Sequence, residues 1–137
     1  MRSALRWIVV VIIVAIVAAG SFAVWHAVQR SRQVQSYVLL EMMGHAIERV
    51  PARERTAETL YRAVGGVYGG RDAWGNPVAV HTKSQPESYV LVSFGSDGRP
   101  DTTSTAAYFG MVESDIRRQT AHDIVLRDGK AITFAGK

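Results

Sequence analysis

The first third of the chain contains a continuous apolar run, followed by a run in which apolar residues recur at helical spacing. No charged residue occurs between Trp7 and Gln29, a stretch longer than the ~20 apolar residues that a helix needs to cross a bilayer. Trp7 and Trp25 lie near the two ends of this run, where indole side chains prefer the headgroup level. Because the backbone inside hydrocarbon must satisfy its own hydrogen bonds, the run predicts a single transmembrane helix within an anchor at 1–29.

A cleavable signal peptide is the alternative interpretation of this run. Arg2 and Arg6 would form its basic region, and Ser21-Phe22-Ala23 resembles a small-x-small cleavage site. The apolar residues continue past Ala23 and a helical pattern follows directly, which favours an uncut anchor. The short N-terminal tail and its two arginines favour an outward-facing C-terminal part, although Arg30 and Arg32 oppose that orientation.

The periodic run predicts an amphipathic helix over 30–50, continuous with the membrane helix from about residue 5. Its apolar face is expected to consist of residues spaced by three and four positions, namely Leu39, Met43, Ala46, Ile47 and Val50. Val34 and Val38 extend this face toward the N-terminus. Pro51 ends the pattern, because proline disfavours the α conformation of the preceding residue. We expect this face to pack on the domain that follows, and the alternative is that it forms a surface for a partner helix.

The remainder predicts one short helix and a small antiparallel sheet. Thr56 is a candidate N-cap for a helix over 56–64, with Glu58 near the positive end of the helix dipole. Strand-like segments occur at 78–82, 89–94, 123–126 and 130–134, and the last two flank an Asp128-Gly129 hairpin signal. Residues 103–122 are ambiguous, with one short helix possible at 112–119.

The predicted fold class is therefore α+β, with two domains. Residues 1–29 form the anchor, and residues 30–137 form a second domain with helices over 30–50 and 56–64 and a sheet within 72–136. The sheet is expected to bury one face against the amphipathic helix.

Three segments of the second domain, 72–77, 89–98 and 123–129, have the composition of turns, strands and a hairpin. In this order they resemble the type IV pilin-like family, and most closely the major pseudopilins of type II secretion systems. Asp72-Ala73-Trp74-Gly75-Asn76-Pro77 resembles the family's D-x-W-G-N-P turn, and 89–98 is similar to its Y-x-x-x-S-x-G-x-D-G strand and loop. Residues 123–129 resemble a D-I-V-x-x-[DN]-G hairpin of pilin-like relatives. The segments occur in the family's order between residues 72 and 129.

The resemblance implies a pilin-like fold and a non-enzymatic, structural role in a type II secretion or type IV pilus-like apparatus. The chain would cross the bacterial inner membrane once, with a periplasmic C-terminal domain, and its partners would be copies of itself and other pseudopilin or secretion-apparatus subunits. The family's loop often binds calcium, and the matching candidates here are Asp97, Asp101 and Asp123, with Glu113 and Asp115 as an alternative acidic pair. Their other interpretation is ordinary turn and strand-end chemistry.

The N-terminal run departs from the family pattern, which places a glutamate early in the apolar helix. Here Gly20 is followed by Ser21-Phe22-Ala23-Val24-Trp25, and the first acid after Met1 is Glu41. This difference leaves open a second function, that of a stand-alone membrane-tethered periplasmic binding or adaptor module with a pseudopilin-like head.

Composition excludes several other classes. The chain has no cysteine, so disulfides, thiolate metal sites and a cysteine nucleophile are excluded. Its net charge is +4 and its basic residues are scattered, so no nucleic-acid partner is expected. The four histidines are far apart in the sequence, and no hydrolase or phosphate-binding motif occurs. We therefore predict no catalytic residues and no enzymatic activity, and a secreted soluble domain or hydrolase released after Ala23 is the remaining alternative.

Overall fold

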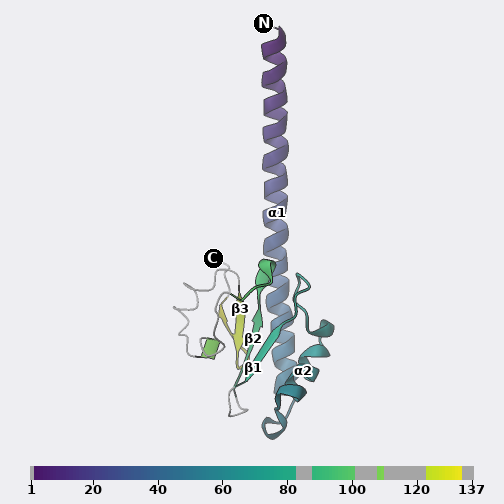
Figure 1. Cartoon of the computed structure of the whole chain (residues 1–137), viewed down its shortest axis with the longest axis vertical. Helices are drawn as coiled ribbons and strands as arrows, with labels where there is room; N and C mark the ends of the chain where they lie inside the picture. Colours follow the sequence, from purple (N-terminus) through teal and green to yellow (C-terminus); the bar gives the residue numbers. More distant parts are fainter. Residues whose placement is uncertain (1, 83–87, 101–107, 110–122, 134–137) are drawn as a thin grey trace. The chain divides into compact units, whose positions relative to one another are not determined.

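The computed structural model describes residues 2–82, 88–100, 108–109 and 123–133 (Figure 1). The chain divides into two compact units, Met1–Ser31 and Arg32–Lys137. One helix, α1 (Arg2–Glu48), begins in the first unit and ends in the second. It ends just before Pro51, where the Val50 amide donates to the carbonyl of Ile47.

The second unit combines the end of α1 with short helices and a four-stranded antiparallel sheet (Figure 1). The shorter helices are η1 (Ala52–Glu54), α2 (Ala57–Gly65), η2 (Tyr68–Gly70) and η3 (Gly95–Asp97). The strands β1 (Ala79–Thr82), β2 (Tyr89–Ser93), β3 (Ile124–Arg127) and β4 (Lys130–Thr133) are neighbours in chain order. The predicted α+β class is confirmed, whereas the predicted helix at 112–119 lies outside the described residues.

Helix α2 begins as its sequence predicts. The Thr56 side chain accepts a hydrogen bond from the Thr59 amide at 3.2 Å, and the Thr56 amide donates to Thr59 Oγ1 at 2.8 Å. This reciprocal cap satisfies backbone groups that a helix start leaves without intrahelical partners. Leu60 and Val64 form the buried face of the helix, and the Tyr61 hydroxyl donates to the Val80 carbonyl at 3.3 Å, so α2 contacts edge strand β1.

The hairpin between β3 and β4 also agrees with the prediction. Its two loop residues, Asp128 and Gly129, have φ values of +49° and +74°. Positive φ at both central positions defines a turn whose twist matches that of the flanking strands.

The buried face of α1 agrees with the predicted one at Met43 and Ile47 and differs from it elsewhere. The buried residues are Ser36, Leu40, Met43, Gly44 and Ile47. Val34 and Val38 are instead 45% and 46% exposed, and Leu39 is only partly buried. The small residues explain the difference, because a Cβ at Gly44 would lie 2.9 Å from Leu126 Cδ2. The sheet approaches α1 where α1 has least bulk, and not where its side chains are most apolar.

Both faces of the sheet are covered. One face packs against α1 and α2 through Tyr89, Leu91, Ile124 and Leu126. The other forms a second cluster of Val90, Val92, Val125 and Ile132 with Tyr108. Every residue of β2 is therefore buried. This burial explains why residues 89–92 form a continuous apolar run and not an alternating pattern.

Candidate functional site

A buried aspartate organises the turn that precedes β1. Asp72 is only 5% exposed, and its Oδ1 accepts hydrogen bonds from the amides of Trp74 at 3.0 Å and Asn76 at 2.8 Å. Its Oδ2 accepts from Ser93 Oγ at 2.7 Å. The carboxylate thus joins the first and second resembling segments through two residues that are 21 positions apart in the chain.

Asn76 and two glycines complete this junction. Asn76 Nδ2 donates to the Gly95 carbonyl at 2.8 Å, and a Cβ at Gly98 would lie 3.0 Å from Asn76 Oδ1. Gly75 has a φ of +87°, a conformation that favours glycine. The glycines at 75 and 98 therefore serve backbone geometry and close approach.

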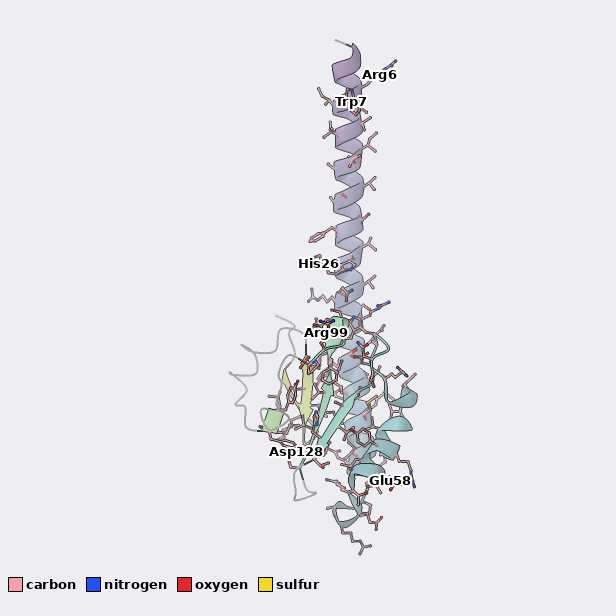
Figure 2. The ribbon with its side chains drawn as sticks, viewed as in Figure 1. Arg6, Trp7, His26, Glu58, Arg99 and Asp128 are labelled. Atoms are coloured by element: carbon pink, nitrogen blue, oxygen red, sulfur yellow. The ribbon has the colours of Figure 1, made fainter. Side chains whose placement is uncertain are left out.

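The third resembling segment joins the same sheet through Asp128, which Figure 2 labels. Its Oδ1 accepts from the Tyr89 amide at 2.9 Å, and its Oδ2 accepts from Ser88 Oγ at 3.0 Å. The Asp128 amide donates to the Tyr89 carbonyl at 3.1 Å. The first and third segments are thus hydrogen-bonded to the two ends of β2, which lies in the second segment.

Trp74 is partly buried and packs against the core cluster that includes α1. The Ala73 amide donates to Ser36 Oγ of α1 at 2.9 Å. This hydrogen bond and the Trp74 side chain hold the turn against α1. Ser36, which the apolar pattern did not single out, is a polar contact between the helix and this turn.

The predicted calcium ligands are only partly described. Asp97 is exposed, and its Oδ1 accepts from the Arg99 amide at 3.1 Å. Asp123 is 1% exposed and its Oδ2 accepts from the Tyr108 hydroxyl at 2.6 Å. Within the described ranges, no three acidic or histidine side chains form a group that could hold a metal. Asp101, Glu113 and Asp115 lie outside the described residues, so the calcium site stays a prediction.

Two titratable side chains on the sheet have pKa values shifted by their surroundings. The His81 ring stacks on Tyr108 with a centroid separation of 5.9 Å, and burial lowers the pKa of His81, which favours the neutral imidazole. Burial, with the nearby Glu48 and Asp128 carboxylates, raises the pKa of Tyr89 to about 12. The Tyr89 hydroxyl therefore stays protonated and donates to the Gly44 carbonyl at 3.4 Å. The His81 ring thus contacts Tyr108, and the Tyr89 hydroxyl contacts α1.

A groove of about 760 Å³ lies between α1 and the 68–75 loop, and we call it the α1 groove. Its α1 side is formed by Val34, Val38, Leu39 and Met42, and its loop side includes Tyr68 and Trp74. The sequence pattern favoured packing of Val34 and Val38 on the sheet and left a partner-helix surface as the alternative, and both side chains are exposed on the groove. The signal for a second apolar surface was the width of the apolar stripe on α1, which exceeds what one buried face needs.

The charged groups of the α1 groove are mainly basic. Arg32 and Arg71 both line it and are exposed, whereas Asp72 is buried and accepts the three hydrogen bonds described above. One guanidinium nitrogen of Arg71 donates to the Gly75 carbonyl at 2.7 Å. The groove thus combines an apolar floor with two exposed cations.

The first unit is a helical segment with exposed apolar side chains. In Figure 2 the Trp7 side chain lies near the N-terminal end of α1 and that of His26 further along the helix. The His26 ring is 4.3 Å from that of Phe22 and 5.0 Å from that of Trp25, measured between centroids. Trp7 is 70% exposed. Helix α1 is long and apolar enough to cross a membrane.

Comparison of the chain with models of protein families, with characterised proteins and with solved structures found no match.

Proposed function

We propose that this protein is a membrane-anchored, pseudopilin-like structural subunit of a type II secretion or type IV pilus-like apparatus. In this role α1 would anchor the chain in the bacterial inner membrane, and the second unit would lie in the periplasm. The protein would act by assembling with copies of itself and with other subunits, and it would catalyse no reaction.

The observation that carries the proposal is the way in which the three resembling segments interlock. The Asp72 carboxylate binds the Ser93 hydroxyl, and the Asp128 carboxylate binds the Tyr89 amide at the other end of β2. Segments that resemble one family separately are therefore parts of one hydrogen-bonded unit. The long apolar helix continues without a break into that unit, as an anchored subunit requires.

The α1 groove favours the second candidate function, a tethered adaptor that binds one partner protein. An apolar, cationic groove is a binding surface whether or not copies of the chain associate. The two functions differ in what the membrane helix contacts. A structural subunit packs its helix against copies of itself in one orientation, whereas an adaptor has no need of that contact.

The absence of cysteine permits a direct test of self-association. Single cysteines are placed at each position from 13 to 24 of the full chain in its native membrane, and disulfide-linked dimers are quantified after oxidation. The proposal predicts yields that rise and fall with the helical repeat of about 3.6 residues, because one face of each helix meets its neighbour. Arg53→Cys, on the exposed η1, is the control. Yields that are uniform along the helix and no higher than this control contradict the structural-subunit proposal.

A further inference from the structure

We propose that the α1 groove is the docking site for an acidic amphipathic helix belonging to a different protein. The inference rests on the proposed function only in that the anchored chain acts through contacts with other proteins. It does not require that copies of the chain associate.

The apolar floor of the groove has the spacing of a helix-packing surface. Val34, Val38 and Met42 are four residues apart and are 45%, 46% and 45% exposed. Residues at this spacing form a ridge along the helix, and a second helix packs its own ridges beside it. Leu39, Trp74 and Tyr68 widen this surface toward the loop. The floor therefore accepts apolar side chains spaced at i, i+4 and i+7 on a partner helix.

A helix fits this surface better than an extended segment does. A helix satisfies its backbone hydrogen bonds internally, whereas an extended segment needs a sheet edge to pair with. At the β1 edge of the sheet, the Tyr61 hydroxyl of α2 already donates to the Val80 carbonyl. The groove itself offers apolar side chains, and these contact a helical ridge without backbone pairing.

The charges specify an acidic partner. Arg32 and Arg71 are exposed cations on the groove, and the bond from Arg71 to the Gly75 carbonyl uses only one of the five N–H donors of a guanidinium. The buried Asp72 carboxylate is turned toward the amides of its own turn and toward Ser93. Carboxylates flanking the apolar ridge of a partner helix would form charge-assisted hydrogen bonds with the two arginines.

A second copy of this chain has the wrong charge for the same position. The stretch of α1 that carries the apolar ridge, 30–42, contains Arg30 and Arg32 but only one acid, Glu41. Glu41 Oε1 already accepts a hydrogen bond from the Tyr37 hydroxyl at 2.5 Å. Docking this stretch into the groove of another copy would bring like charges together. Charge complementarity therefore selects a different protein.

Photo-crosslinking in the native membrane tests this inference. Met42 of the full chain is replaced by p-benzoylphenylalanine, and Arg53 carries the same probe in a control. The crosslinked peptide is identified by mass spectrometry. We expect a segment of another protein with apolar residues at helical spacing flanked by Asp or Glu. Arg32→Glu is expected to lower the adduct yield about tenfold, and Arg32→Lys is expected to retain most of it, because the positive charge persists.

Every other result overturns the inference. An adduct with this chain, with a lipid or with a segment lacking acids would assign the groove to another occupant. An unchanged yield in Arg32→Glu would exclude the charge argument, and a yield no higher than that of the Arg53 control would exclude docking. None of these outcomes affects the cysteine experiment on the membrane helix, so the two proposals fail separately.

Discussion

Replacing Asp72 by alanine is expected to lower the free energy of unfolding of the second unit by about 3–5 kcal/mol, the largest effect predicted for any single substitution here. The change leaves the amides of Trp74 and Asn76 and the hydroxyl of Ser93 without their acceptor. A buried group that loses its hydrogen bond costs about 1–3 kcal/mol. The Ser93 hydroxyl is buried, and the two amides are partly buried. The turn would lose its link to β2, and the position of Trp74 against the core depends on that turn.

Urea unfolding of the full chain in detergent micelles measures this effect. Trp7→Phe and Trp25→Phe form the background, so that fluorescence reports Trp74 alone. Asp72→Asn is the matched control. Its amide oxygen still accepts from both backbone amides, and its NH₂ donates to the Ser93 hydroxyl, so we expect a loss of about 1–2 kcal/mol. A loss below about 1 kcal/mol for Asp72→Ala would mean that the carboxylate does not hold the turn.

Replacing Gly44 by valine is expected to cost about 3 kcal/mol, because it overpacks the contact between α1 and the sheet. A Cβ at this position lies 2.9 Å from Leu126 Cδ2 and 3.3 Å from the Tyr89 hydroxyl oxygen. Alanine is expected to cost less, since the Leu126 side chain can move and alanine gains about 1 kcal/mol of helix propensity over glycine. Valine adds two further methyl groups in the same gap.

Gly65→Val is the control for this prediction. Gly65 ends α2, and a Cβ there would have no atom within 4 Å, so we expect its effect to stay within about 0.5 kcal/mol. The same urea unfolding compares the two variants. Equal effects of Gly44→Val and Gly65→Val would contradict the account of why the sheet packs on this face of α1.

Local sequence signals predicted most of the elements. The continuous apolar run, the Thr56 cap and the Asp128-Gly129 turn each act within a few residues, and the structure contains α1, α2 and the β3–β4 hairpin at the expected places. Strand β2 was evident because a strand buried on both faces has a continuous apolar sequence.

Interactions between distant segments could not be predicted in the same way. Hydrophobic periodicity treats Leu39 and Leu40 as nearly equivalent. Which of the two is buried depends on Ser36 and Gly44, the small residues that allow the turn and the sheet to approach α1. The role of Asp72 depends on Ser93, which is twenty-one residues away. The α1 groove could not be located for the same reason, since its floor is the part of the apolar stripe that the sheet does not cover.

We propose that α1 remains intact in the mature protein, so that its first part anchors the chain while its last part packs on the sheet. The most direct test is the intact mass of the protein extracted from its native membrane fraction. Our account predicts the mass of the full chain, or that mass less Met1. A mass corresponding to a chain that begins at Val24, found in the soluble fraction, would contradict it and would identify the first part of α1 as a cleaved signal peptide.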